Sequence, residues 1–336
     1  MRVLFWGTPA YAVPSLEALI EAGHTVVGVV SQPDRRRGRG KALLPSPVKA
    51  RALELQIPVL TPERIRKQPE MQQQLAALGA DVSVVVAFGQ LLPPEVLQQP
   101  PLGCWNGHGS LLPRWRGAAP IQWSLLDGDA TTGVGIMAME AGLDTGPVLL
   151  EQSTPIQLLD NAQTLGARLS AMTAELLVEA LERIAAAGPG PEPERLLRLG
   201  VKQQQEAGMS HARLLTKADS SIDWSAKALA IHRQVMGLHP GATTLWRGQR
   251  LKVLASEPLI ARLADQLSPD VRPLIGQYDG GEPGTVLANA APLGLVVATG
   301  GCPLLLRQAQ LEGRAASSGQ ALLQQLKAEP GDQLGA

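Results

Sequence analysis

Short apolar runs alternate with helical patterns in the first third of the chain, and this alternation constrains the fold more than any other feature. The runs Val3–Trp6 and Val26–Val30 flank a helical pattern from about Ala12 to Glu21. Such alternation is typical of βαβ units on a parallel sheet. Further elements are expected as strands at 81–86, 103–106, 133–139 and 148–150 and as a long amphipathic helix at 162–187. The pattern predicts an α/β fold that is Rossmann-like and doubly wound.

The sequence changes in character after the long helix. Glycine and proline alternate from Gly188 to Pro191 and a further proline follows at Pro193, which ends the helix. Beyond residue 242, short β-like runs broken by turns favour a smaller C-terminal domain with an OB-like β-barrel. These runs are 243–246, 251–255, 284–288, 293–298 and 304–308, with helices expected at 226–236 and 319–327. We therefore predict an N-terminal domain over residues 1–205 and a barrel domain over residues 206–330.

The composition is that of an ordinary globular protein. The 336 residues are 45% hydrophobic and include 30 basic and 30 acidic side chains, which excludes a disordered chain. No apolar run approaches the roughly 20 residues of a membrane span, and no leader precedes Phe5–Gly7. Cys104 and Cys302 lie far apart, which argues against a disulfide framework and a zinc knuckle. We expect a cytoplasmic protein with no membrane partner.

A net charge of zero hides an uneven distribution. Residues 1–67 carry 11 basic and 5 acidic side chains, residues 68–200 carry 6 and 14, and residues 201–262 carry 9 and 4. Two basic stretches separated by an acidic one suit a large anion that touches both domains. Solvated faces that merely differ in charge would give the same pattern.

The motifs of several common enzyme classes are missing. Gly7-Thr8-Pro9 follows the first strand where a dinucleotide fold places G-x-G-x-x-G, and Pro9 lacks the N–H that a pyrophosphate needs. Neither a Walker loop nor an H-E-x-x-H motif occurs, so we predict no metal site. Asp144-Thr145-Gly146 matches the aspartic-protease triplet, but an acid dyad needs two carboxylates and no second triplet occurs.

Asn106 and His108 are the strongest catalytic candidates among the residues themselves. They end a predicted strand, near the carboxyl edge where open α/β sheets bind ligands. Residues i and i+2 of an extended segment lie on one side, so both side chains are expected to face the same cleft. They can stabilise an oxyanion, and a carboxylate such as Asp144 can hold the imidazole protonated or accept a proton. The alternative is a purely structural hydrogen bond of His108.

A longer string around these two residues resembles a known family. Residues 106–121, NGHGSLLPRWRGAAPI, resemble the signature of formyltransferases that use 10-formyltetrahydrofolate, in particular those that act on initiator tRNA. The resemblance covers most of the chain and is weakest after about residue 255. Its other parts are 7–9, 31–34, 45–49, 142–146 and 222–224.

The resemblance implies an activity and its site residues. It implies transfer of a formyl group from 10-formyltetrahydrofolate, as cosubstrate, to the α-amine of methionine on initiator methionyl-tRNA. The family's catalytic residues map onto Asn106, His108 and Asp144. Its folate-contacting residues map onto Ser110, Leu111, Leu112 and Pro113. The resemblance also implies that a loop at 88–92 lies on the pterin side of the folate. The alternative for Leu111 and Leu112 is that they are ordinary leucines of the hydrophobic core.

The segment 35–41 carries five cations in seven residues, interleaved with glycines. By itself it predicts a phosphate-seeking loop, or else a solvated surface loop. In the family this insertion reaches the tRNA acceptor end, which implies tRNA contacts by Arg35, Arg36, Arg37, Arg39 and Lys41. The barrel domain would supply a second tRNA surface. We expect a monomer.

Two other functions stay open from the sequence. One is a related formyltransferase that acts on an amino sugar nucleotide or another small amine. The other is a non-catalytic RNA-binding protein on the same fold.

The sequence departs from the family pattern at two places. Gly107 stands where a β-branched residue is commoner, and we expect a looser backbone there. His239–Ala242 replaces a more aromatic stretch of the family, so we expect the start of the second domain to differ from the family in its details.

Overall fold

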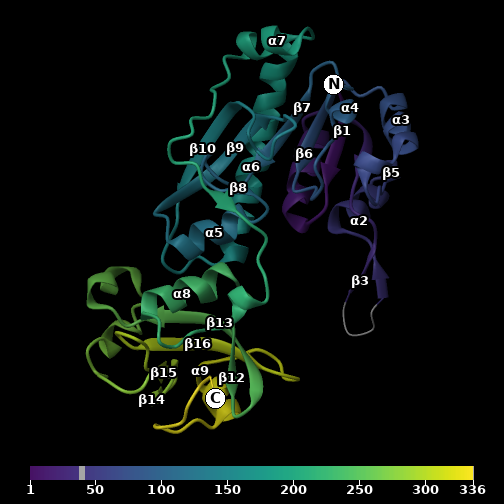
Figure 1. The fold of residues 1–336 in the computed structure, drawn as a ribbon. Helices are drawn as coiled ribbons and strands as arrows, with labels where there is room; N and C mark the ends of the chain where they lie inside the picture. Colours follow the sequence, from purple (N-terminus) through teal and green to yellow (C-terminus); the bar gives the residue numbers. More distant parts are fainter. Residues whose placement is uncertain (38–41, 336) are drawn as a thin grey trace. The chain divides into compact units, whose positions relative to one another are not determined.

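The computed structural model describes residues 1–37 and 42–335, which fold as two compact units. The first unit contains residues 1–120, 131–154 and 166–213, and the second contains residues 121–130, 155–165 and the chain from Leu214 onward. We predicted a single domain boundary after residue 205, whereas the chain passes from one unit to the other several times. The part of the second unit after Leu214 is green to yellow, and its two shorter segments have the teal of the middle of the chain (Figure 1).

A seven-stranded sheet forms the centre of the first unit, with strand order β10-β9-β7-β6-β1-β2-β5. The strands are β1 (Arg2–Gly7), β2 (Thr25–Val30), β5 (Val59–Leu60), β6 (Val82–Val86), β7 (Cys104–His108), β9 (Thr131–Ala138) and β10 (Val148–Pro155). The pairings from β5 through β2, β1 and β6 to β7 are parallel, and β9 pairs antiparallel with β7. The chain extends the sheet to both sides of β1, so the predicted doubly wound α/β fold is confirmed.

Helices cover both faces of this sheet. They are α1 (Val13–Glu21), α2 (Pro47–Glu54), α3 (Pro69–Ala77), α4 (Pro94–Leu97), α6 (Ala162–Ala187) and α7 (Glu192–Leu199), with 3-10 turns at η1 (Ala10–Ala12) and η2 (Ile65–Lys67). Val3 and Phe5 of β1 pack with α1, α2 and α6. Leu4 and Trp6 point to the other face and pack with α3 and α4. Burial on both faces explains why these strands read as continuous apolar runs.

Two small sheets complete the first unit. The hairpin of β3 (Arg35–Arg37) and β4 (Ala42–Leu44) is antiparallel, and its connecting residues 38–41 lie outside the described chain. β8 (Arg116–Gly117) pairs in parallel with β11 (His211–Ala212). This second pair joins the segment after the central strand β7 to the last residues of the unit.

The second unit is a small antiparallel barrel with helices packed on it. Its strands are β12 (Thr243–Trp246), β13 (Gln249–Pro258), β14 (Val286–Ala290), β15 (Gly294–Val297), β16 (Leu304–Leu311) and β17 (Ser317–Ser318). Its helices are α5 (Pro120–Asp127), α8 (Ala228–Gly237) and α9 (Gly319–Leu326), with 3-10 turns at η3 (Ala218–Ser220), η4 (Ala261–Gln266) and η5 (Arg272–Leu274). Strands β12 and β14 are the edges of the sheet order, and the C-terminal residues bridge both of them. Leu334 pairs with Trp246, and Gln333 pairs with Thr285. The predicted small β-barrel is confirmed.

A buried histidine ties α8 to the rest of the second unit. His232 receives a hydrogen bond at Nδ1 from Ser256 Oγ at 3.1 Å and donates from Nε2 to the Leu158 carbonyl at 2.8 Å. Burial lowers its pKa to about 4, so the imidazole is neutral at physiological pH.

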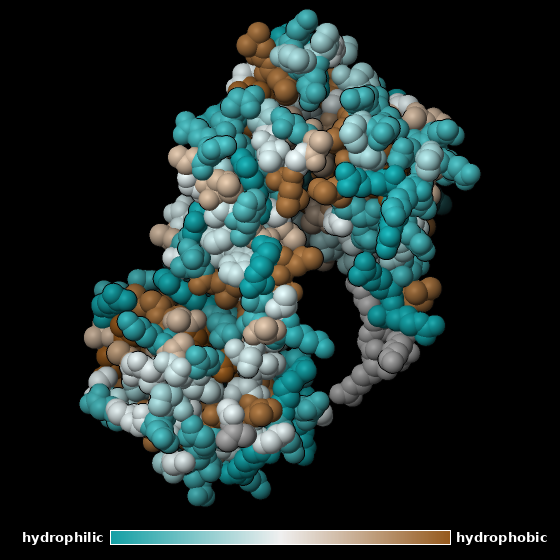
Figure 2. All heavy atoms as spheres, in the orientation of Figure 1, coloured by the Kyte–Doolittle hydropathy of each residue, from teal (hydrophilic) through white to brown (hydrophobic). Residues whose placement is uncertain are grey.

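The surface of the molecule is largely hydrophilic on the face that Figure 2 shows. Within residues 1–37 and 42–335, none of the helices is both long and apolar enough to cross a membrane.

Candidate active site

Strand β7 places Asn106 and His108 at its carboxyl end. The strand lies between β6 and β9. Asn106 pairs with Val85 of β6, and His108 pairs with Gly135 of β9. Both side chains are almost fully buried, with 9% of Asn106 and 5% of His108 exposed. A buried Asn and a buried His need polar partners, and a single loop supplies a carboxylate that hydrogen-bonds to Asn106 and faces His108.

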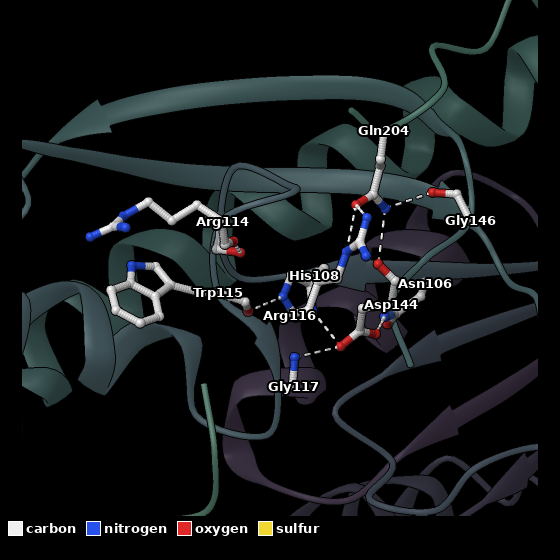
Figure 3. A network of polar contacts seen from close by, with 10 residues as sticks. Asn106, His108, Arg114, Trp115, Arg116, Gly117, Asp144, Gly146 and Gln204 are labelled. Carbon is white, nitrogen blue, oxygen red and sulfur yellow. Dashed lines mark hydrogen bonds and ion pairs between the residues drawn. The ribbon is translucent and has the colours of Figure 1, made fainter. Parts of the chain in front are cut away.

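That loop connects β9 to β10 and carries Asp144. Asp144 Oδ1 accepts a hydrogen bond from Asn106 Nδ2 at 3.3 Å, and its Oδ2 accepts one from the Gly117 amide at 2.8 Å. The same Oδ2 lies 3.7 Å from His108 Nδ1 (Figure 3). The structure therefore brings together all three side chains that the sequence analysis predicts to be catalytic.

The hydrogen bond on the far side of the imidazole fixes where His108 exchanges a proton. His108 Nε2 lies 3.0 Å from the Trp115 carbonyl oxygen. Because a carbonyl oxygen can only accept, Nε2 must carry a hydrogen. Protonation and deprotonation are then confined to Nδ1, the atom that faces Asp144, and a proton there is attracted by the carboxylate.

Gly107, between the two candidates, has a packing role. A Cβ on Gly107 would lie 2.6 Å from Thr173 Cγ2 of α6. Gly107 pairs with Ile136 inside the sheet and its φ is not positive. The expected looser backbone is therefore not the main consequence of this glycine, because the missing side chain makes room for Thr173.

Cys104 begins the same strand, and burial makes it chemically inert. Its Sγ donates to the Leu97 carbonyl at 3.5 Å, and desolvation raises the pKa of the thiol to about 12. The thiolate, which is the nucleophilic form, is then absent at neutral pH. Cys104 is therefore not a nucleophile of this site.

The structure adds residues that sequence reasoning missed. Gln204 Nε2 donates to the carbonyl oxygens of Asp144, at 2.9 Å, and of Gly146, at 2.7 Å. Gln204 Oε1 accepts from Arg116 Nε at 2.9 Å and Nη2 at 2.7 Å. Figure 3 shows this side chain between Arg116 and the Asp144 loop. Arg116 lies within the string that resembles the family, whereas Gln204, in a run of three glutamines, gives no local signal.

The predicted folate-binding residues follow β7 directly. The Ser110 hydroxyl donates to the Arg114 carbonyl at 2.7 Å, and Leu112 packs with Met137 and Val148. Leu111 and Pro113 are half-buried. Ser110 and Leu112 thus have structural partners, and the folate contacts of all four residues stay a prediction.

The predicted tRNA-binding cations lie on or next to the β3–β4 hairpin. Arg35 and Arg36 are exposed on β3, and Arg37 ends that strand in register with Ala42. Arg39 and Lys41 lie outside the described residues. None of the described members of this set belongs to the network of Figure 3, and their role stays a prediction.

Over the described parts of the chain, no three His, Cys, Asp or Glu side chains group closely enough to hold a metal ion.

Two protein-family models match the chain, one in each of its two halves. A model described as formyl transferase matches residues 1–181, and one described as formyl transferase, C-terminal domain, matches residues 214–327. The fold and the Asn106, His108 and Asp144 cluster thus belong to a formyl transferase. A methionyl-tRNA formyltransferase of Synechococcus sp. (strain RCC307) is 72% identical over 97% of this chain and 100% of its own length. One of Prochlorococcus marinus (strain MIT 9303) is 59% identical over 99% of this chain and 98% of its own. The chain belongs to the methionyl-tRNA formyltransferase family.

Solved structures of lower identity share the fold. An N-formyltransferase of Helicobacter canadensis, solved with folinic acid and dTDP-3-aminofucose, has a TM-score of 0.60 at 14% identity and covers 91% of this chain and 98% of its own. HypX of Aquifex aeolicus, solved with tetrahydrofolic acid, has a TM-score of 0.60 at 15% identity over 99% of this chain and 48% of its own. At these identities the likeness supports the architecture only.

Proposed function

We propose that this chain transfers the formyl group of 10-formyltetrahydrofolate to the α-amine of methionine on initiator methionyl-tRNA. The observation that carries the proposal is the cluster of Asn106, His108 and Asp144 at the carboxyl end of β7. It occurs in a chain that is 72% identical to a protein named for this acceptor.

The reaction makes two demands on the protein. The amine attacks the formyl carbon, a new C–N bond forms, and the bond to the folate nitrogen breaks. A negative charge develops on the formyl oxygen, and a proton must pass from the amine to the departing nitrogen. A site for this reaction needs a hydrogen-bond donor for the oxygen and a group that exchanges a proton.

The three residues meet these demands in complementary ways. One Asn106 N–H is bonded to Asp144, and the amide has a second N–H to offer the formyl oxygen. His108 holds or releases a proton at Nδ1 because its Nε2–H is committed to Trp115. The Asp144 carboxylate holds Asn106 and faces the Nδ1 of His108. Fixed donors in a buried site stabilise charge more effectively than water does.

Substrate binding is proposed for the residues around this cluster. We assign folate contacts to the segment Ser110–Pro113. We assign tRNA backbone contacts to the cations of 35–41, of which Arg35 and Arg36 are exposed. The second unit supplies a further tRNA surface. The protein acts as a monomer in the cytoplasm.

A single-turnover assay with 10-formyltetrahydrofolate tests this function. Methionyl initiator tRNA, methionyl elongator tRNA and free methionine are offered in parallel. Formylation of the initiator alone is the expected result. Failure with all three, while the folate still binds, would overturn the tRNA assignment and point to a small amine acceptor.

The variant His108→Ala tests the catalytic assignment in the same assay. It is expected to abolish turnover while both substrates still bind, because the imidazole is the group that exchanges a proton. Full activity in this variant would refute the role given to the cluster.

A further inference from the structure

The last residues of the first unit form a connecting segment, residues 202–212, that is fastened to both sides of the active site. At its start, Lys202 and Val148 of β10 exchange two backbone hydrogen bonds of 2.8 Å each. At its end, the Ser210 carbonyl accepts from the Arg116 amide at 2.9 Å, and the Ala212 carbonyl accepts from the Ala118 amide at 2.8 Å. The connecting segment therefore spans from the strand after Asp144 to the strand after His108.

Gln204 is the residue of the connecting segment that reaches into the site. It is half-buried, whereas its neighbours Gln203 and Gln205 are exposed. Its amide nitrogen donates to the carbonyl oxygens of Asp144 and Gly146, and its amide oxygen accepts twice from Arg116. One side chain thus makes four hydrogen bonds to the two segments that contain Asp144 and Gly117.

The Asp144 backbone needs such support. Asp144 has a φ of +53°, in the left-handed region, which is unfavourable for an L-residue. The two carbonyl groups that Gln204 holds belong to this residue and to Gly146. A donor that bridges them favours the turn that directs the carboxylate toward Asn106 and His108.

Gln204 also bridges the Asp144 loop and β8 through its hydrogen bonds. Asp144 Oδ2 accepts from the Gly117 amide, and Gly117 directly follows the Arg116 that Gln204 binds. The same amide group therefore binds the Asp144 backbone and the side chain of the residue before Gly117. If it were lost, the loop and the strand could separate, and the 3.7 Å contact of the carboxylate with His108 would be lost with it.

We propose that Gln204 is a positioning residue for formyl transfer, whose amide N–H groups hold the Asp144 loop so that the carboxylate faces His108 and Asn106. This inference rests on the proposed role of Asp144. Gln204 acts through Asp144, not on the substrates, so its removal is expected to slow the chemical step without weakening binding. A displacement of a catalytic group by about 1 Å can cost roughly 100-fold in rate.

Three variants distinguish the contribution of the Gln204 amide nitrogen from that of its amide oxygen. Gln204→Met keeps the length and loses both the donor and the acceptor. Gln204→Glu still accepts from Arg116 but has no N–H for the carbonyls of Asp144 and Gly146. Gln205→Met makes the same change at the exposed neighbour and serves as the matched control.

The experiment measures the single-turnover formylation rate and the binding of 10-formyltetrahydrofolate and methionyl-tRNA for each variant, with His108→Ala as reference. Gln204→Met and Gln204→Glu are both expected to be about 10- to 100-fold slower than the unmodified protein. Both are expected to keep substrate binding, and Gln205→Met is expected to be unchanged.

The other outcomes overturn the proposal. If Gln204→Glu is as fast as the unmodified protein while Gln204→Met is slow, only the Arg116 contact matters and the proposed donation is wrong. If both Gln204 variants are fast while His108→Ala is inactive, Gln204 has no positioning role and the proposed function stands. If His108→Ala is itself active, the function is wrong instead. Equal losses of rate and of binding would indicate a general disturbance, which also refutes positioning.

Discussion

The contact between Gly107 and α6 allows a quantitative test of how the catalytic strand is packed. Gly107→Ala places a Cβ 2.6 Å from Thr173 Cγ2, well inside van der Waals contact. Thr173 cannot turn away easily, because its Oγ1 donates to the Leu169 carbonyl at 2.7 Å and pairs with the Tyr11 hydroxyl at 2.8 Å. A β-branched side chain in a helix also has few rotamers. The added methyl group must therefore strain the interface.

The expected energies follow from the two groups in conflict. Overpacking costs about 2 kcal/mol, the middle of its usual range, and the reduced freedom of the unfolded chain returns about 0.7 kcal/mol, so Gly107→Ala should lose about 1.3 kcal/mol. Thr173→Ser removes the methyl group, keeps the hydroxyl, and costs about 1 kcal/mol. In the double variant the new Cβ occupies the space of the lost methyl group. Its stability should lie within about 0.5 kcal/mol of the original, a coupling of about 1.5–3 kcal/mol.

Urea unfolding of the full chain, followed by circular dichroism, measures the four proteins of this cycle. The single-turnover rate is the second readout, since Gly107 lies between Asn106 and His108. Thr173→Ser is expected to restore both the stability and the rate that Gly107→Ala loses. Additive losses in the double variant, or a Gly107→Ala variant as stable as the original, would refute the packing argument.

Three further predictions concern other parts of the chain. Reversing the charge of Arg35 and Arg36 to Glu should weaken tRNA binding and lower its salt dependence by about two counterions, measured by titration at several salt concentrations; unchanged affinity at low salt would exclude this surface. The pKa of His232 is lowered from 6.5 to about 4 in the folded state, so below pH 6.5 the unfolded chain takes up a proton that the folded chain excludes. The free energy of unfolding should therefore be highest above pH 6.5 and fall by about 3 kcal/mol as the pH drops to 4. Acid unfolding of His232→Gln should lack this dependence, and an identical profile would contradict it. In the folded protein, a thiol reagent should label the exposed Cys302 and leave the buried Cys104 unlabelled, which mass spectrometry would show. Rapid labelling of the variant Cys302→Ser, whose remaining thiol is Cys104, would contradict this prediction.

Local periodicity was sufficient for most of the fold. The helix predicted at 162–187 has the same bounds in the structure, and the strand predicted at 243–246 does as well. Both are long or regular enough for their apolar spacing to be read directly. The two-residue strands β8 and β11 were missed, because two residues carry no periodicity and their pairing joins segments far apart in the sequence.

The candidate site was predictable in part for the same reason. Asn106 and His108 share one strand, so their spacing alone indicated that they face the same way. Asp144 was only one possible carboxylate partner until the family resemblance singled it out, and its contacts depend on a loop with a positive φ. Gln204 lies 60 residues beyond Asp144, and only the folded chain shows that its amide reaches that loop. Gly107 was interpreted by its flexibility, while its partner Thr173 could be found only in three dimensions.

The central claim is that the carboxylate of Asp144, held against His108 and Asn106, is needed for formyl transfer. The most direct measurement is the single-turnover formylation of initiator methionyl-tRNA by Asp144→Asn, which keeps the size of the side chain and removes its charge. The account predicts a rate at least about 100-fold below that of the unmodified protein, with the folate and the tRNA still bound. A rate within about threefold of the unmodified protein would contradict it.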